Sequence, residues 1–352
     1  ACEHKQACGW ILSSLFSSFF YKLISKNPMN TQSIGVDVGK TELVASIRDS
    51  DGNSAMPALF PNSSVGLKKF LVYLKKNEIT EDDPILFEST GPYHWQACRT
   101  LADEGYFIKV ANPLHTKQIA RLSIRKRKTD KVDSQNLAFL ASQNYGYRFV
   151  ETEEMAKKKA MVRHYWKLRQ SATDHLRHDR YMKEYRGIND ESVSKFMIKR
   201  CEALKKIIVK EWSKGNDVKY LDSIPGITPF LAATLLAELL PLERFKTIDQ
   251  IVAFSGLDPS VKQTGGKAGH HGHISKRGSP TLREALFLAA FGSFQREPMK
   301  SIYVRYKARG LHHNTVLCIL GRKILRISIS LLKKRRVFDP TKLSTADDLT
   351  GT

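Results

Sequence analysis

Short apolar runs with strand-like alternation between residues 33 and 111 place the strongest constraint on how this chain folds. Ile34, Val36 and Val38 alternate along a first run. After a Gly-Lys turn a second run extends over 43–47, which predicts a β-hairpin. Further along, the pattern predicts a strand at 56–60, a helix at 65–76, a strand at 84–88, a helix at 94–104 and a strand at 107–111.

Four acidic residues occupy places in this pattern where a metal-dependent nuclease needs carboxylates. Three antiparallel strands followed by alternating helices and strands is the order of an α/β ribonuclease H-like domain, which we predict over residues 29–150. In that arrangement Asp37 lies on the first strand and Glu88 ends the fourth. Asp130 and Asp133 are three residues apart in KTDKVDSQN, so a helix would project both carboxylates to the same side.

The two aspartates of DKVD have a second interpretation, as partners in weak surface ion pairs with Lys126, Lys128 or Lys131. Joined to Asp37 and Glu88, however, the set becomes more specific. Carboxylates that directly follow buried strand residues are costly to place without a task. The four residues therefore predict a pocket for two divalent cations, and oxygen ligands without nearby cysteine favour Mg²⁺ or Mn²⁺ over zinc.

The chain is strongly basic. Lys and Arg number 57 against 35 Asp and Glu, which gives a formal net charge of +22, and the excess gathers in 117–131 and 322–336. A solvated helix face is the alternative for any single charge run. A carboxylate cluster in so basic a chain is nevertheless costly unless metal and phosphate share the site, which predicts a nucleic-acid partner. Candidate contacts in the first basic stretch are Lys126, Arg127 and Lys128.

Residues 1–28 precede the patterned sequence and are interpreted as a non-native or upstream extension, with a weak signal peptide as the alternative. Their apolar run is too short to span a bilayer comfortably, so no membrane association is expected. The five cysteines are scattered without CxxC spacing, which indicates neither a disulfide framework nor a zinc site. We expect a bacterial-type cytoplasmic, nucleoid-associated protein.

Two further regions follow the first domain. Residues 151–216 have no proline and alternate charged with apolar positions, which predicts a helical, coiled-coil linker that serves either as a spacer or for dimerisation. Residues 217–335 are predicted to form a mostly α C-terminal domain, and 336–352 a tail. The segment IPGITPFLAATLL, near the start of the C-terminal domain, is typical of a helix-hairpin-helix-like element that holds a DNA phosphate, or of an ordinary helical packing unit.

A Gly-rich loop predicted over 256–278 carries side chains capable of chemistry. The three histidines of HHGH could resemble a metal site, but without a fourth ligand we favour phosphate or solvent contacts for them. Counter-charges for phosphate are Lys262, Lys267, Lys276, Arg277 and Arg283. Hydroxyls that could act as a nucleophile or simply hydrogen-bond a turn are Ser255, Ser260, Thr264, Ser275 and Ser279.

Six motifs in this order make the chain resemble the transposases of the insertion sequence 110 family, relatives of the Piv DNA invertase. They are IGVDVGK, FESTGPYHW, KTDKVDSQNLAFLA, IPGI, FSGLDPSVKQTGG and ISKRGSPTLREAL, and the match covers about residues 33–332. The resemblance implies a site-specific DNA recombinase with a RuvC-like DEDD domain. The acidic tetrad then falls on Asp37, Glu88, Asp130 and Asp133 and binds Mg²⁺.

The resemblance also implies a serine nucleophile that joins covalently to DNA, a bridge RNA that pairs with donor and target DNA, and a homodimer that assembles into a tetramer. The family serine falls on Thr264 of KQTGG. Either Thr264 acts as the nucleophile, or Ser260 has taken the role, or this copy is impaired. The rival interpretations are a RuvC-like nuclease or junction resolvase that uses water, and an inactive copy that only binds DNA or RNA.

Overall fold

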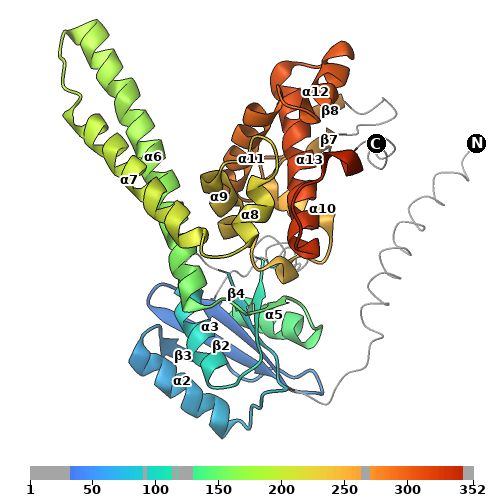
Figure 1. The fold of residues 1–352 in the computed structure, drawn as a ribbon. Helices are drawn as coiled ribbons and strands as arrows, with labels where there is room; N and C mark the ends of the chain where they lie inside the picture. The colour runs from blue at the N-terminus through green and yellow to red at the C-terminus, as the bar shows by residue number, and fades with distance from the viewer. Residues whose placement is uncertain (1–31, 90–92, 113–115, 117–129, 263–269, 344–352) are drawn as a thin grey trace, which may run out of the picture. The chain divides into compact units, whose positions relative to one another are not determined.

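The computed structural model describes residues 32–89, 93–112, 116, 130–262 and 270–343. The extension 1–28 and the end of the tail lie outside this part of the chain. The chain divides into two compact units, residues 1–151 and 152–352, which are described separately below (Figure 1). None of the helices in the described ranges has the length and apolarity needed to cross a membrane.

The first unit is built on a six-stranded mixed sheet with the order β3-β2-β1-β4-β5-β6. The strands β1, β2 and β3 are antiparallel neighbours, β4 joins β1 in parallel, β5 is parallel to β4, and β6 closes the sheet in the antiparallel direction. This confirms the predicted ribonuclease H-like order. The strands are Ser33–Val38, Glu42–Arg48, Ala58–Pro61, Ile85–Glu88, Ile108–Ala111 and Tyr147–Arg148.

Helices cover both faces of this sheet. On one face the helices α2 (Ser64–Lys76) and α3 (Tyr93–Asp103) bury side chains such as Phe70 against the strands. On the other face α5 (Asp130–Ser142) packs on β1, β2 and β4 through a smaller apolar cluster that includes Leu137. The alternation read from the sequence explains this division, because successive strand residues point to opposite faces.

The second unit begins with two long helices, α6 (Glu153–Arg186) and α7 (Ser192–Trp212), which lie side by side as a hairpin (Figure 1). Thr152 caps the start of α6, and Gly187 ends it in the left-handed conformation. Near the base of the hairpin the ring of Tyr165 lies 4.5 Å from that of Phe230, so these helices share a core with the helices that follow. The predicted linker helices therefore pack within this unit.

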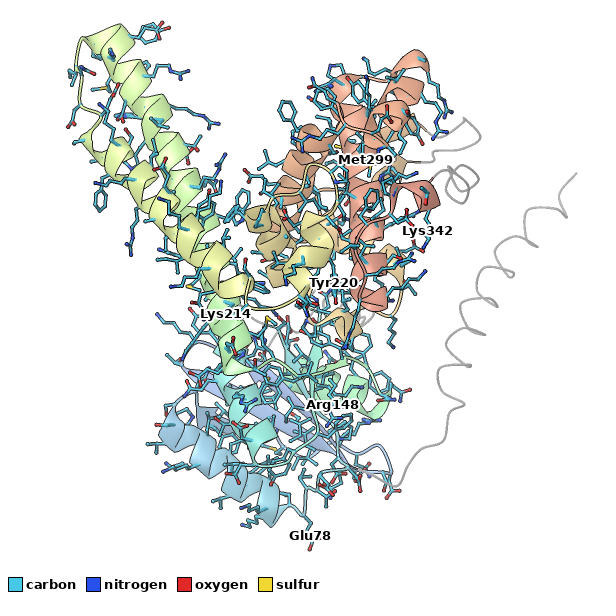
Figure 2. The ribbon with its side chains drawn as sticks, in the orientation of Figure 1. Glu78, Arg148, Lys214, Tyr220, Met299 and Lys342 are labelled. Carbon is cyan, nitrogen blue, oxygen red and sulfur yellow. The ribbon has the colours of Figure 1, made fainter. Side chains whose placement is uncertain are left out.

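The remainder of the second unit is mostly helical, as predicted. Met299, which begins α12 and is labelled in Figure 2, is fully buried in its core. The helices are α8 (Asp217–Asp222), α9 (Pro229–Leu239), α10 (Ile248–Ser255), α11 (Pro280–Ser293), α12 (Met299–Ala308) and α13 (His313–Lys334), with short 3-10 helices η1 (Leu242–Arg244) and η2 (Pro340–Leu343).

The α8–turn–α9 element matches the helix-hairpin-helix-like segment in outline. Its turn residue Gly226 has a φ of +90° and faces α11: a Cβ there would lie 2.5 Å from the amide nitrogen of Ser293. A neighbouring helix therefore occupies the Gly226 side of the turn, and phosphate binding by the turn amides stays a prediction.

Part of the stretch predicted as a loop is regular. Residues Pro259–Lys262 (β7) and His270–Ile274 (β8) pair as an antiparallel hairpin. A loop over the whole of 256–278 was therefore wrong. The glycines and polar residues of the stretch hid two short strands that lack an apolar alternation.

Candidate metal centre

The four predicted carboxylates come from adjacent elements of the first unit. The parallel register of β1 and β4 pairs Val36 with Phe87, so the next residues along the two strands, Asp37 and Glu88, are neighbours. Asp130 and Asp133 lie in the first turn of α5, the helix that packs on β1. Segments that are far apart in sequence thus place their acidic residues at one end of the sheet.

Three of these residues have the geometry of a cation site. One carboxylate oxygen from each of Asp37, Asp130 and Asp133 lies within 4.8 Å of the others. Asp37 and Asp133 are half-buried, and Asp130 is exposed. A group of carboxylate oxygens so close together is the ligand type that Mg²⁺ and Mn²⁺ prefer.

The fourth carboxylate, Glu88, affects the pKa of Asp37. Burial and the negative charges of Asp130, Glu88 and Asp133 together raise the pKa of Asp37 to about 6. The amide N–H of Val38 donates a 2.9 Å hydrogen bond to Asp37 Oδ1 and opposes this rise. Burial and the neighbouring carboxylates therefore destabilise the charged form of Asp37, and a divalent cation beside it would remove that penalty. The donor set fits such an ion.

Small residues let α5 approach the sheet closely enough to complete the cluster. A Cβ at Gly35 of β1 would lie 2.1 Å from the Ala138 nitrogen and 2.2 Å from the Ser134 carbonyl oxygen, so α5 rests directly on the strand backbone. The hydroxyls of Ser46 and Ser134 are 2.8 Å apart. Ser33 donates a 3.1 Å hydrogen bond to the carbonyl of Ala138. The sequence analysis did not identify these residues.

Hydrogen bonds from a buried lysine fix the C-terminal end of α5. Lys109 of β5 is buried, and its Nζ donates to the Asn144 backbone oxygen at 2.6 Å and to its side-chain oxygen at 2.8 Å. Asn144 has a φ of +54° just past the end of the helix. A lysine at a helix C-terminus interacts favourably with the helix dipole, which explains why this charge is tolerated inside the unit.

Two protein-family models match this chain. One, described as a transposase and named for the DEDD transposases of IS110, covers residues 34–182, which include all four carboxylates. The other, described as the transposase IS116/IS110/IS902 family, covers residues 218–304. The chain belongs to the IS110 family of transposases. The expected resemblance is therefore confirmed, and the segment matched by the DEDD model contains the cluster of Asp37, Asp130 and Asp133.

Individual proteins are similar to this chain over different shares of its length. The transposase is 24% identical to the pilin gene-inverting protein of Moraxella bovis over 319 residues, which cover 88% of this chain and 98% of that protein. It is 31% identical over 114 residues to an uncharacterized 43.6 kDa protein of insertion element IS110 from Streptomyces coelicolor, covering 32% and 28% of the two chains. RuvC of Thermus thermophilus with a Holliday junction aligns over 34% of this chain and 99% of its own, with 13% identity and a TM-score of 0.27.

The predicted basic contacts of this IS110-family transposase divide into two groups. Lys276 and Arg277 are exposed beside the base of the β7–β8 hairpin. Arg283 instead donates from Nη1 to the carbonyls of Ser255 and Arg277 at 3.3 and 3.4 Å, so it also braces the chain that leaves the hairpin. Lys262 belongs to β7. Lys126, Arg127, Lys128 and Lys267 lie outside the described residues.

Three of the candidate hydroxyls have structural partners. Ser255 is fully buried and donates to the Val252 carbonyl at 2.6 Å. The Ser275 hydroxyl donates to Asp258, and Ser279 caps the start of α11 by accepting from the Leu282 amide at 3.1 Å. These contacts favour turn and cap roles for the three serines. Ser260 belongs to β7, and Thr264 lies outside the described residues.

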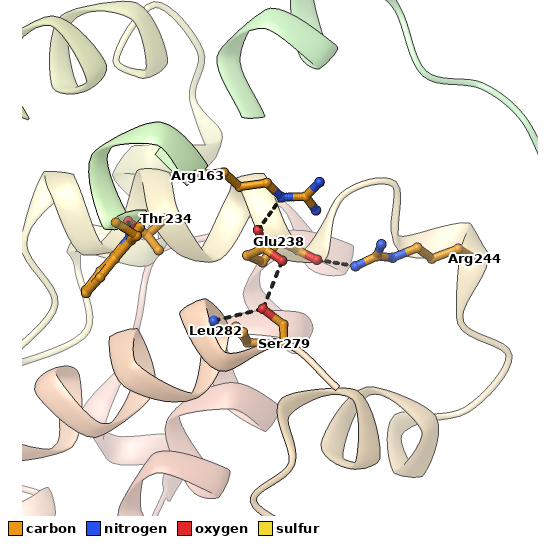
Figure 3. Close-up of polar contacts among 7 residues, drawn as sticks. Arg163, Thr234, Glu238, Arg244, Ser279 and Leu282 are labelled. Atoms are coloured by element: carbon orange, nitrogen blue, oxygen red, sulfur yellow. Dashed lines mark hydrogen bonds and ion pairs between the residues drawn. The ribbon is translucent and has the colours of Figure 1, made fainter. Parts of the chain in front are cut away.

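A buried carboxylate ties the second unit together and was missed by the sequence analysis (Figure 3). Glu238 of α9 is 3% exposed; it accepts from Arg163 of α6 at 2.9 Å and from the Ser279 hydroxyl at 3.0 Å. Arg244 donates to the Glu238 carbonyl oxygen. The only local signal was a single acidic residue in the apolar run LAATLLAEL. Its network joins α6 and α9 to the segment that follows the β7–β8 hairpin.

Proposed function

We propose that this transposase is a site-specific DNA recombinase that mobilises an insertion sequence, and that Asp37, Glu88, Asp130 and Asp133 hold the divalent ions of its cutting site. The observation that carries the proposal is the cluster of Asp37, Asp130 and Asp133 oxygens within 4.8 Å, with the pKa of Asp37 raised by burial and by all three other carboxylates. Mg²⁺ is the expected ion and Mn²⁺ the alternative.

The residues of the chain contribute position and charge. When bound, the ions polarise a phosphoryl oxygen and stabilise the oxygen that leaves phosphorus. Asp37 is oriented by the Val38 amide, and Asp130 and Asp133 are fixed by the contact of α5 with β1. A ligand set held by a strand pair and a packed helix is rigid, which favours catalysis because little reorganisation is needed during the reaction.

The nucleophile belongs to the second unit in this proposal. The hydroxyl oxygen of Thr264 attacks the scissile phosphorus, a protein–DNA phosphodiester forms, and the bond to the departing 3′ oxygen breaks; that oxygen takes up a proton. Ser260 is the alternative nucleophile, and an impaired copy would form no adduct. The anchored base of the β7–β8 hairpin supports the proposal, because it fixes both ends of the intervening segment.

Donor and target DNA, a bridge RNA and further copies of the chain are the proposed partners. Support for self-association comes from the α6–α7 hairpin, which exposes Tyr181, Tyr185 and Phe196 to solvent. The rings of Tyr181 and Tyr185 lie 5.1 Å apart and form part of an apolar surface far along the hairpin. We propose that a dimer forms there and pairs into a tetramer, in which the carboxylates of one subunit meet the hydroxyl of another.

The test combines cleavage with adduct trapping. Purified protein, with the RNA encoded beside its element, is incubated with labelled donor and target DNA and Mg²⁺. We expect Asp37→Ala and Asp133→Ala to abolish cleavage, whereas Asp51→Asn, a change at an exposed turn, retains it. Cleavage that persists in both carboxylate variants would refute the metal-site assignment.

Denaturing gels then identify the nucleophile. A covalent protein–DNA adduct lost in Thr264→Ala supports Thr264, and one lost only in Ser260→Ala moves the role to Ser260. Cleavage with no adduct in any variant would show that water is the nucleophile, as in the rival nuclease interpretation.

A further inference from the structure

The end of the second unit contains a long stretch without acidic residues. Residues 298–338 have no Asp or Glu, and the structure describes all of them as α12, α13 and their connections. The basic residues of the stretch are Lys300, Arg305, Lys307, Arg309, Arg322, Lys323, Arg326, Lys333, Lys334, Arg335 and Arg336. A charge run of this kind usually forms a solvated face, so its internal geometry decides whether it is more than that.

Arg322 and Arg326 are one helical turn apart on α13 and lie on the same side of it. Gly321 sets their surroundings, because a Cβ there would lie 3.3 Å from Leu257, so α13 runs close to the chain just before Asp258. Tyr306 of α12, the helix that packs against α13, lies near Arg322. These side chains form one cluster across α12 and α13.

Two more arginines flank the same tyrosine. The guanidinium carbons of Arg305 and Arg309 lie 5.8 and 5.6 Å from the centre of the Tyr306 ring. Tyr306 is half-buried, and Arg305, Arg309 and Arg326 are exposed. The cluster thus presents several guanidinium groups around one aromatic ring, which is the combination that nucleic-acid surfaces use for phosphates and bases.

The surroundings of Arg322 destabilise the charged form of its side chain. It is half-buried, and burial followed by the positive charge of Arg326 lowers its pKa. Asp258 contributes the smallest of the opposing effects, and it accepts a hydrogen bond from Ser275. Among the residues that the structure describes, Arg322 has no ion pair within 4.0 Å and no hydrogen bond. Two neighbouring cations without a close carboxylate are stabilised when an anion binds between them.

We propose that Arg322 and Arg326, with Tyr306, Arg305 and Arg309 around them, form a binding site for the phosphodiester backbone of a nucleic acid. The planar guanidinium group can donate to two phosphate oxygens at once. Solubility alone would require only charged groups, without this geometry. The site lies in the second unit and does not use the carboxylate cluster. It therefore stands whether or not the carboxylates cut DNA.

The test measures binding by the full-length protein in EDTA, where no cleavage occurs. Fluorescence anisotropy with a labelled DNA duplex and, separately, a labelled RNA hairpin gives Kd at several salt concentrations. Each phosphate contact contributes about 0.9 to the slope of log K against log salt, so we expect the slope to fall by about two in Arg322→Gln/Arg326→Gln. At physiological salt Kd should rise about tenfold or more for the nucleic acid that uses the site.

The matched control removes two arginines that already have carboxylate partners. Arg99 pairs with Asp103 at 2.6 Å and Arg177 with Asp174 at 3.3 Å, so Arg99→Gln/Arg177→Gln makes the same change in net charge at residues that do not belong to the cluster. If both double variants weaken DNA and RNA binding equally, the cluster acts only through net charge and the proposal is wrong. Unchanged binding in Arg322→Gln/Arg326→Gln also overturns it.

Two further measurements separate the remaining explanations. We expect Arg322→Gln to leave Tm unchanged or higher, because it removes a half-buried positive charge. If Tm falls, binding by the single variant Arg326→Gln, at an exposed position, tests the proposal instead. Inorganic phosphate at constant ionic strength is the probe for a free-anion site. A phosphate-induced rise in Tm that the double variant loses, together with normal DNA and RNA binding, would overturn the nucleic-acid site.

Discussion

Replacement of Gly35 by alanine tests whether the contact of α5 with β1 positions the carboxylates. The new Cβ would lie 2.1 Å from the Ala138 nitrogen and 2.2 Å from the Ser134 oxygen, both backbone atoms. Ordinary contacts of this type are not shorter than about 3.2 Å, so α5 must move about 1 Å away from the strand. Overpacking of this kind costs about 1–3 kcal/mol of stability.

The same movement affects the metal site. Mg²⁺ binds oxygen at about 2.1 Å, so two oxygens that share one ion are at most about 4.2 Å apart. The oxygens of Asp37, Asp130 and Asp133 already lie within 4.8 Å of one another. A displacement of α5 by about 1 Å would move the Asp130 and Asp133 oxygens away from Asp37 by a large fraction of one metal–oxygen bond length. We expect Mg²⁺ affinity to fall about 10–100-fold, the usual cost of disturbing the support of a metal ligand.

Calorimetric Mg²⁺ titration and thermal unfolding, with and without Mg²⁺, measure the two effects on Gly35→Ala. Gly215→Ala is the matched control, because the nearest atom to its new Cβ is 4.0 Å away. If Gly35→Ala binds Mg²⁺ with the affinity of the unaltered protein and shows the same Tm, the close helix–strand contact does not position the carboxylates.

Three other perturbations have defined outcomes. Without metal, the folded protein binds a proton on Asp37 (pKa about 6) more tightly than the unfolded chain does (3.8). This contribution to stability is complete below pH about 4 and is lost as pH rises through about 6; after discounting for partial exposure it is about 1–2 kcal/mol. Urea unfolding in EDTA should show the loss, and Asp37→Asn should remove it. Glu238→Gln cancels the buried charge that accepts from Arg163 and Ser279, and should lower the unfolding free energy by about 1–3 kcal/mol in urea titrations. Lys109→Met leaves the end of α5 without its donor to Asn144, and should lower Tm by an amount equivalent to about 1–3 kcal/mol.

Each of these has a contrary result. A stability of the metal-free protein that is flat between pH 4 and pH 6 would show that Asp37 is not perturbed. Glu202, exposed on α7, is the control for Glu238, and equal effects of Glu→Gln at the two positions would contradict a role for the buried network. If Lys109→Met is as stable as the unaltered protein, the hydrogen bonds from Lys109 to Asn144 do not stabilise the C-terminal end of α5.

The sequence predicted the sheet, and it placed the acidic residues on the elements that carry them, because both depend on local patterns. Alternation in β1 and β2 marked the hairpin, and Asp37 and Glu88 stood out because each adjoins buried strand residues. The spacing of Asp130 and Asp133 was informative because a helix places residues three apart on one side. The order of elements then brought the four together, which pattern analysis with the family resemblance could anticipate.

The supporting contacts were not predictable in the same way. Gly35 and Ser134 have no periodic signal, and their contact joins positions about a hundred residues apart. Glu238 gave a local signal, but its partners Arg163 and Ser279 come from distant segments. The strands β7 and β8 were hidden by glycine and polar residues, since strand prediction relies on an apolar alternation that they lack. The role of a small or polar residue depends on its neighbours in space, and only the folded structure shows which residues those are.

The order of the sheet also governs when the metal site comes into existence during synthesis. A chain that has emerged only as far as β5 already contains Asp37 and Glu88, but α5, with Asp130 and Asp133, is still to come. Until that helix docks, the Gly35 side of β1 lacks its cover and the ligand set is half complete. A cation held by these carboxylates, as proposed, would therefore stabilise the docking of α5 and not the pairing of the first strands.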